Sequence, residues 1–138
     1  MIKVIVNGAL GKMGKVLTRC VKEDKDLELV CGASLPTGET TDYKLYTNMV
    51  DIEESADVII DFSIPVATFT ILEFAKKHKI PTVIATTGFS DEEFSKIKNF
   101  STKLDKIDYM FWKKYKDENN NYGYFGIGFM SSGKSSDI

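Results

Sequence analysis

The chain has 138 residues, a net charge of −2, and apolar and charged fractions of 43% and 28%. These values are ordinary for one soluble globular domain. The small net charge gives no general attraction to nucleic acid or to acidic membranes, and no apolar run is long enough to span a bilayer. Because the first residues also lack the apolar core of a signal peptide, we expect a cytoplasmic protein with no nucleic-acid partner and no membrane partner.

The cysteine content gives no sign of a metal or redox centre. Cys20 and Cys31 are the only two cysteines, and their separation fits neither a metal-ligand pair nor a redox pair. We expect both to be buried thiols in a reducing compartment, and we predict no metal site.

Strands and helices alternate along the first 100 residues. β-Branched and apolar runs predict strands over residues 2–6, 27–31, 44–47, 56–61 and 82–86. Apolar spacing predicts a helix from Met13, with Met13, Val16, Leu17, Cys20 and Val21 on one face, and a second helix over 66–79 with Pro65 in its first turn. This alternation predicts an α/β fold: a Rossmann-like parallel sheet with right-handed crossovers and helices on both faces.

A third helix has a well-defined predicted start. Ser90 and Glu93 have the spacing of a capping box, and Phe89 and Phe94 flank it at the positions of a hydrophobic staple. We therefore expect a helix from residue 91, with Ile97 among its buried residues.

The sequence changes character near residue 100. Lys, Asn, Tyr and Phe dominate the remainder, and neither a period of 2 nor a period of 3.6 persists past Leu104. We predict a dinucleotide-binding domain over 1–100 and an irregular C-terminal tail over 101–138, and the sequence leaves open whether that tail is ordered or native.

Three glycines separate the first predicted strand from the first helix. Gly8, Gly11 and Gly14 are spaced G-x-x-G-x-x-G, which differs from the commoner G-x-G-x-x-G. A pyrophosphate needs free backbone N–H groups, the positive end of a helix, and no Cβ in its path. The turn therefore predicts a dinucleotide site, and the alternative is a helix-entry turn whose glycines serve close packing.

The end of the second predicted strand bears on which cofactor binds. An acidic residue there usually holds the adenosine ribose, but the positions in question are Ser34 and Pro36, and Glu39 lies further along the loop. Lys12 adds a positive charge, so the site admits NADPH or NADH; the alternative for Lys12 is a solvated surface residue.

Three motifs carry a family resemblance: V-N-G-A-L-G-K-M-G at 6–14, D-F-S-I-P at 61–65 and A-T-T-G-F at 85–89. Residues 2–97 resemble the N-terminal domain of the bacterial dihydrodipicolinate reductases (4-hydroxy-tetrahydrodipicolinate reductases) of lysine and diaminopimelate biosynthesis. The resemblance implies an oxidoreductase that transfers hydride from NAD(P)H to a cyclic dihydrodipicolinate-type substrate. The implied cofactor-binding residues are Gly8, Ala9, Leu10, Gly11, Lys12, Met13, Ser34, Phe62, Ser63, Ala85, Thr86 and Thr87.

The chain departs from the family at several positions. Ala85 stands where the family has glycine, and Ser34 or Pro36 where it has its acidic ribose ligand. Read without the family, Asp61 and Ser63 have a second interpretation, as a cap before the helix at Pro65.

The family's catalytic segments, a histidine pair, a lysine and a D-A-P-S-G-T loop, are not in this sequence. The single histidine, His78, lies among lysines at a helix end, where we expect a solvated residue favourable to the helix dipole. We therefore predict no catalytic residue, cofactor binding without turnover, and a small-molecule substrate only where a catalytic domain is supplied.

Residues 128–135 read G-F-M-S-S-G-K-S, which matches the phosphate-binding loop of P-loop NTPases and is similar to the opening of a shikimate kinase. Residues 122–127 supply a candidate strand before it, but such a loop also needs a following helix and an acid for Mg²⁺. The chain stops at Ile138, so we expect no working NTPase site. Two alternatives to a reductase portion stay open: a stand-alone nucleotide-binding regulatory module and a P-loop nucleotide binder.

Overall fold

The computed structural model describes residues 1–103, 109–116, 119 and 122–129. The elements are β1 (Ile2–Asn7), α1 (Lys12–Glu23), β2 (Leu27–Ala33), β3 (Leu45–Tyr46), the 3₁₀ helix η1 (Met49–Asp51), β4 (Val58–Asp61), α2 (Pro65–His78), β5 (Thr82–Ile84), α3 (Asp91–Lys103), β6 (Tyr109–Lys116) and β7 (Tyr122–Phe129). Among the described residues, no helix is long and apolar enough to cross a membrane.

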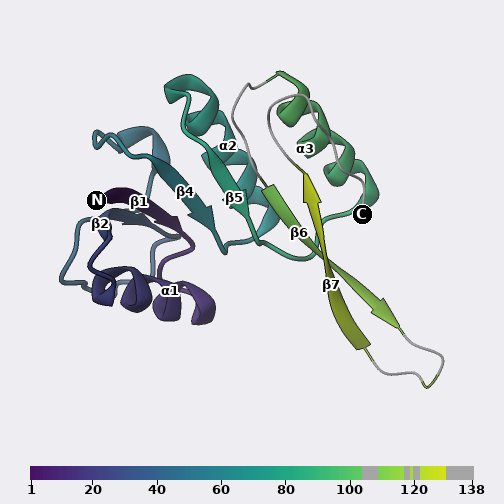
Figure 1. Ribbon diagram of the computed structural model, residues 1–138, viewed down its shortest axis with the longest axis horizontal. Coiled ribbons are helices and arrows are strands. Elements are labelled where there is room, and N and C mark those ends of the chain that lie inside the picture. The colour runs from purple at the N-terminus through teal and green to yellow at the C-terminus, as the bar shows by residue number, and fades with distance from the viewer. Residues whose placement is uncertain (104–108, 117–118, 120–121, 130–138) are drawn as a thin grey trace.

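The first five strands form one parallel sheet in the order β3-β2-β1-β4-β5. Helices α1 and α2 lie on opposite faces of this sheet (Figure 1). The chain builds outward from β1 to β3 and then returns to the other side of β1 with β4, so the strand order reverses between β1 and β4. The structure confirms the predicted Rossmann-like fold.

The residues of β1 explain why both faces are covered. Successive strand side chains point to opposite faces, and here Val4 and Val6 join one apolar cluster with Val21 of α1, whereas Ile5 joins the cluster that includes Ile71 of α2. Burying a side chain of this size contributes about 1.5–3 kcal/mol. A continuous β-branched run is therefore stable only in the centre of the sheet, with a helix on each side.

The buried face of α1 differs from the predicted apolar stripe. Gly14, Thr18 and Val21 are buried, whereas Met13 and Val16 are 52% and 39% exposed. The close approach at Gly14 sets this face, because a Cβ there would lie 1.8 Å from the carbonyl oxygen of Gly8.

The two cysteines differ in burial, so the prediction that both are buried is wrong for one of them. Cys20 lies on the exposed side of α1. Cys31 of β2 is buried as expected, and burial, followed by the charge of Glu54, raises its pKa to about 12.

The predicted helix starts are confirmed. Pro65 is the first residue of α2. Before α3, the backbone N–H of Ser90 donates to Oε1 of Glu93 at 2.9 Å, and the backbone N–H of Glu93 donates to Oγ of Ser90 at 3.1 Å. The rings of Phe89 and Phe94 pack edge to face at 6.0 Å, which completes the staple.

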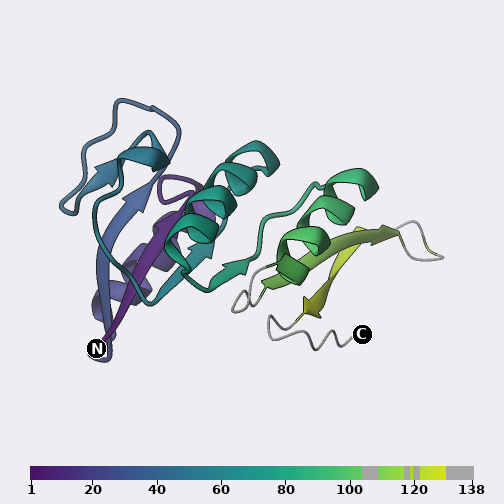
Figure 2. The same cartoon turned by 90° about the horizontal axis from the view of Figure 1, so that it is seen from above.

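Beyond α3 the structure differs from the expected irregular tail. Strands β6 and β7 form a separate antiparallel pair that starts at Tyr109↔Phe129 and ends at Lys116↔Tyr122 (Figure 2). Aromatic residues favour strands, but Gly123, Gly126 and Gly128 interrupt the alternation that would predict one. Helix α3 runs to Lys103, across the predicted boundary at 100/101.

The phosphate-loop pattern falls mostly outside the described residues. Gly128 and Phe129 end β7, paired with Met110 and Tyr109, and the predicted strand over 122–127 lies within β7. Residues 130–135, which contain the lysine and the final serine of the pattern, lie outside the residues that the structure describes.

Candidate functional site

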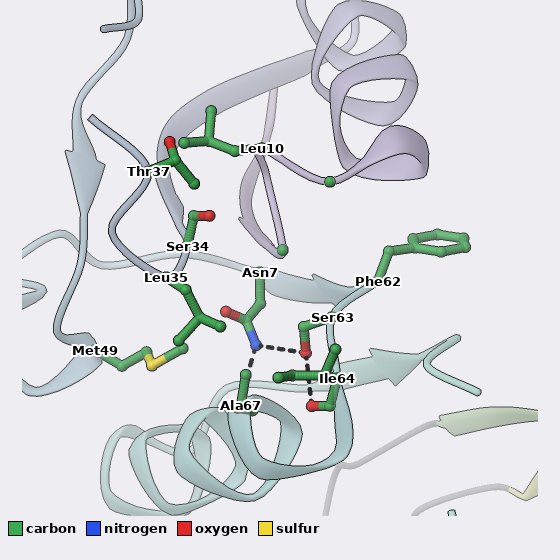
Figure 3. Close-up of a pocket in the computed structure, with 12 residues that line it drawn as sticks. Asn7, Leu10, Ser34, Leu35, Thr37, Met49, Phe62, Ser63, Ile64 and Ala67 are labelled. Carbon is green, nitrogen blue, oxygen red and sulfur yellow. Dashed lines mark hydrogen bonds between the residues drawn. The ribbon is translucent and has the colours of Figure 1, made fainter. Parts of the chain in front are cut away.

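A cavity of about 330 Å³ opens at the carboxyl end of the sheet, where the strand order reverses (Figure 3). Open α/β sheets bind their ligands at this point. Residues that end or follow β1, β2 and β4 line the cavity, together with the first turn of α2 and one residue of η1. They are Asn7, Gly8, Leu10, Gly11, Ser34, Leu35, Thr37, Met49, Phe62, Ser63, Ile64 and Ala67.

The structure gives a different physical reason for glycine at each of the three positions of the turn. Gly8 has a φ of +78°, and a Cβ there would lie 2.2 Å from the carbonyl oxygen of Phe62, so the fold itself requires glycine. Gly14 is required because its α-carbon in α1 approaches the carbonyl oxygen of Gly8 closely, as described above. Gly11 has a φ of −70°, and a Cβ there would meet only the Gly8 carbonyl oxygen, at 3.3 Å. The packing interpretation therefore applies to Gly8 and Gly14, and the ligand interpretation is left to Gly11.

Hydrogen bonds within the turn decide which N–H groups are free to meet a ligand. The N–H groups of Gly8 and Ala9 both donate to the carbonyl of Ala33, at 2.9 and 3.0 Å, and that of Gly11 donates to Gly8 at 3.1 Å. The first N–H groups of any helix lack partners inside it. Within residues 8–14, the N–H groups that donate to no protein acceptor are those of Leu10, Lys12, Met13 and Gly14, and the first three lie at the entry to α1.

The start of α1 adds an electrostatic feature to these donors. Its N-cap residue, Gly11, lines the cavity and makes no side-chain capping bond, and the first turn of α1 contains no acidic residue. The positive end of the helix dipole is therefore not compensated at the cavity by a side chain of the helix. This arrangement suits an anion such as a phosphate.

A buried carboxylate lies behind the cavity. Asp61, the last residue of β4, is fully buried and accepts four hydrogen bonds. Its donors come from β1, from the turn after β4, from α2 and from the loop after β5: Asn7 Nδ2 at 2.9 Å, Ser63 Oγ, Thr68 Oγ1, and Thr86 Oγ1 at 2.9 Å. Four donors use the full acceptor capacity of a carboxylate. We call these five residues the Asp61 network.

Burial raises the pKa of Asp61 above its ordinary value, and the four donors oppose that rise.

The Asp61 network also bears on the interpretation of Asp61 and Ser63 as a cap for the helix at Pro65. The N-cap of α2 is Ile64, with no side-chain capping bond, and Ser63 Oγ donates to Asp61 instead. Asp61 and Ser63 therefore hold the strand ends together, and the capping interpretation is not supported.

The structure brings together about half of the residues predicted to bind the cofactor. Six of them line the cavity: Gly8, Leu10, Gly11, Ser34, Phe62 and Ser63. Ala9 is fully buried beneath the turn, and Lys12 and Met13 are exposed at the start of α1.

The last three predicted residues lie elsewhere. Ala85, Thr86 and Thr87 follow β5 and do not line this cavity. Thr86 is only 2% exposed, and its hydroxyl donates to Asp61 and accepts from the N–H of Ser63. That hydroxyl is therefore occupied inside the protein, and Thr87 is the exposed residue of the three.

Sequence reasoning missed the apolar side of the cavity. Leu35, Met49, Ile64 and Ala67 come from the loop after β2, from η1 and from the start of α2 (Figure 3). No local pattern marks these residues, since they meet only through the sheet topology. Asn7 also lines the cavity, and one signal could have identified it: it is a polar residue that ends a buried strand.

The loop after β2 carries the predicted cofactor discriminator. Ser34 is 9% exposed, and its backbone N–H donates to the carbonyl of Tyr46 at 3.0 Å. Glu39 forms an ion pair with Lys15 of α1, at 3.1 Å. The nearest acid in this loop thus has its own partner.

His78 ends α2 as an exposed residue, as expected, with its ring 4.3 Å from that of Phe74. Among the described residues, no group of three or more His, Cys, Asp or Glu side chains is placed to hold a metal ion.

Comparison with known proteins agrees with this geometry. The family model of the N-terminus of dihydrodipicolinate reductase matches residues 2–112 of the chain. The chain belongs to the dihydrodipicolinate reductase family. The resemblance seen in the three motifs is confirmed, and the family is one of oxidoreductases.

A curated relative shows how much of the family's length is present. The 4-hydroxy-tetrahydrodipicolinate reductase of Caldanaerobacter subterraneus is 40% identical over 104 residues, which are 75% of this chain and 41% of that protein. The chain therefore spans about two-fifths of the length of the curated reductases it matches.

Two solved structures extend the comparison. The dipicolinate-bound dihydrodipicolinate reductase of Paenisporosarcina sp. TG-14 is 26% identical, with a TM-score of 0.57 over 75% of this chain and 44% of that one. The NADP-bound pyrroline carboxylate reductase of Plasmodium falciparum is 11% identical, with a TM-score of 0.56 over 92% of this chain and 48% of that one, and it shows only that the fold is shared.

Proposed function

We propose that this chain is the cofactor-binding portion of a 4-hydroxy-tetrahydrodipicolinate reductase, and that it binds NADPH or NADH in the cavity at the carboxyl end of β1 and β4. One observation carries the proposal: the uncapped start of α1 faces an apolar cavity at the point where the strand order reverses. A dinucleotide offers a pyrophosphate for the helix start and a base for the apolar walls.

Each part of the cofactor has residues suited to hold it. The free N–H groups of Leu10, Lys12 and Met13 suit the pyrophosphate. Leu35, Met49 and Ile64 offer apolar contact to the adenine, with Phe62 and Ser63 beside it.

The loop after β5 suits the nicotinamide end, because it lies at the same edge of the sheet. Ala85, Thr86 and Thr87 would act there through their backbone and through the exposed Thr87 side chain, since the Thr86 hydroxyl is bonded to Asp61.

We infer that the site binds NADPH at least as tightly as NADH. An acid at the end of β2 would repel a 2′-phosphate, but the residue in that position is Ser34 and the nearby Glu39 pairs with Lys15. Lys12, exposed at the start of α1, adds a favourable charge.

When bound, the nicotinamide supplies hydride to a cyclic dihydrodipicolinate-type substrate, as the family name indicates. The sequence contains one histidine, His78, and it lies at the far end of α2 from the cavity. A proton donor contributes about a hundred- to ten-thousand-fold to such a reaction, and substrate positioning adds more. We therefore propose cofactor binding without measurable turnover by this chain, and action on the small-molecule substrate only when a catalytic part is supplied. We also propose a cytoplasmic location, with no nucleic-acid or membrane partner.

A fluorescence titration with NADPH, coupled to a turnover assay, tests the proposal. We expect saturable NADPH binding, no turnover by the chain alone, and turnover when a catalytic domain of the family is added in trans. Absence of NADPH and NADH binding would contradict the proposed function. Binding with no turnover in any combination would instead support a stand-alone regulatory module.

A further inference from the structure

Asn7 occupies a special position in the sheet. It is the last residue of β1 and pairs with Asp61 of β4 across the point where the strand order reverses. Asn7 is fully buried from bulk solvent, and it is also one of the residues that line the cavity. The Asn7 side chain therefore has little contact with bulk water and is placed to meet a ligand that enters the cavity.

The two ends of the Asn7 amide can be assigned from their neighbours. Nδ2 lies 2.9 Å from Oδ1 of Asp61, 3.3 Å from the carbonyl oxygen of Ala67 and 3.3 Å from Oγ of Ser63. A carboxylate and a carbonyl are acceptors only, so the donating end of the amide must face them. Oδ1 is then turned toward the side of the cavity that Ser34 and Leu35 form (Figure 3).

This oxygen is the exception in an otherwise satisfied site. Among the described residues, Oδ1 of Asn7 is the one buried side-chain nitrogen or oxygen atom without a hydrogen-bond partner. Buried polar groups almost always have partners, and an unpaired one is destabilising. The bonds to Asp61 and to the Ala67 carbonyl account for the donating end of the Asn7 amide, but they give Oδ1 no role inside the protein.

An acceptor in this position distinguishes between the parts of a dinucleotide. Phosphate oxygens are acceptors, so Asn7 Oδ1 cannot bond to the pyrophosphate, which the start of α1 suits. The groups on the adenosine half that can donate to it are the ribose hydroxyls and the amino group of the base.

We propose that Asn7 Oδ1 is a specificity-determining acceptor that binds a donor group, a ribose hydroxyl or the base amine, on the adenosine half of the cofactor. This inference rests on the proposed cofactor site and adds a residue to it. A hydrogen bond between neutral groups changes affinity about threefold to tenfold, and the ligand also removes an unpaired buried oxygen, so we expect an effect near tenfold.

Calorimetric titration with four nucleotides tests the proposal: ADP, inosine diphosphate, 2′-deoxy-ADP and 3′-deoxy-ADP. Inosine diphosphate lacks the amine, and each deoxy compound lacks one hydroxyl. We expect the wild-type chain to bind one of the three analogues about tenfold more weakly than ADP, and that analogue identifies the donor. Equal affinity for all four nucleotides overturns the proposal without any variant being made.

Two variants then assign the discrimination to Asn7. Asn7→Ser keeps a donor for Asp61 and removes the amide oxygen, and we expect it to bind ADP and the weak analogue equally. Thr68→Val removes a different donor to Asp61 and lies outside the cavity lining, so we expect it to lose stability and keep the discrimination. Discrimination that survives in Asn7→Ser overturns the role of Asn7, whereas a wild-type chain that binds neither ADP nor NADPH contradicts the proposed function itself.

Discussion

Adding a methyl group at Gly11 tests cofactor binding separately from folding, because we expect it to weaken the first and leave the second intact. We predict that Gly11→Ala lowers NADPH affinity at least tenfold while the chain stays folded. The added Cβ would project from the N-cap of α1 at the cavity wall, beside the N–H groups that suit the pyrophosphate.

The structural cost of this substitution is small. The backbone of Gly11 has a φ of −70°, which any L-residue adopts, and the nearest atom to the new Cβ is the Gly8 carbonyl oxygen at 3.3 Å. An alanine at a helix N-cap costs roughly 1 kcal/mol relative to the preferred residues, and glycine is only a few tenths worse than those. We therefore expect Gly11→Ala to lose about 1 kcal/mol of unfolding free energy or less. A tenfold loss of affinity corresponds to about 1.4 kcal/mol.

The measurement combines NADPH fluorescence titration with urea unfolding on the same preparation. Gly38→Ala is the matched control: it adds the same methyl group where nothing lies within 4 Å, at a residue with a φ of +77°. That φ costs about 1–2 kcal/mol for a non-glycine residue, so the control loses stability without entering the cavity. Unchanged NADPH affinity in a folded Gly11→Ala protein would refute the assignment of the pyrophosphate to this turn.

Gly8 cannot serve the same test. The sequence predicts that a Cβ at Gly8 lies in the path of the pyrophosphate, but in the structure it would meet the Phe62 carbonyl oxygen at 2.2 Å. A substitution at Gly8 therefore disrupts the contact between the turn and β4, and it lowers cofactor affinity through the fold.

Three further predictions concern cofactor choice, acidity and helix stability. Ser34→Asp is expected to shift cofactor preference toward NADH, because the carboxylate repels a 2′-phosphate and accepts from the ribose hydroxyls. Paired NADPH and NADH titrations of both proteins measure this shift. A tenfold NADH preference in the wild type would contradict the inference that the site binds NADPH at least as tightly as NADH. The pKa of Asp61 is raised in the folded chain, so its contribution to stability is full below about pH 4, its unfolded pKa, and is lost as the pH rises through the folded pKa. Asp61→Asn should therefore lose less stability than the wild type between acidic and neutral pH in urea unfolding, and equal losses would count against the burial of an ionisable group there. Ser90→Ala removes the bond to the N–H of Glu93 and should cost about 1 kcal/mol, whereas Ser95→Ala, in the interior of α3, should not destabilise the chain.

Local chemistry made much of the fold predictable. Alternating strand and helix patterns gave the order of the elements through α3, and the capping box at Ser90 and Glu93 placed the start of α3 correctly. These signals act over a few residues, which is the range that a sequence pattern records. The glycine spacing also located the cavity edge, although it did not separate Gly11 from the two glycines that packing requires.

The parts that could not be predicted depend on long-range contacts. Asn7 and Asp61 are 54 positions apart, and they meet only because β4 pairs with β1. Met49 reaches the cavity from η1, a single turn with no periodic pattern. Thr86 looked like a ligand contact because it follows a strand, yet the same position brings its hydroxyl to Asp61.

The Asp61 network makes binding and folding hard to separate at most residues of the site. One carboxylate holds Asn7 of β1, Ser63 after β4, Thr68 of α2 and Thr86 after β5. Removing any donor leaves Asp61 with an unused acceptor in a buried setting, which costs about 1–3 kcal/mol. Loss of cofactor affinity in such a variant would therefore follow from movement of the strand ends as readily as from a lost contact. Groups that line the cavity but do not hold the network, such as the Cα of Gly11 and the Oδ1 atom of Asn7, are where a change in affinity reports on the ligand itself.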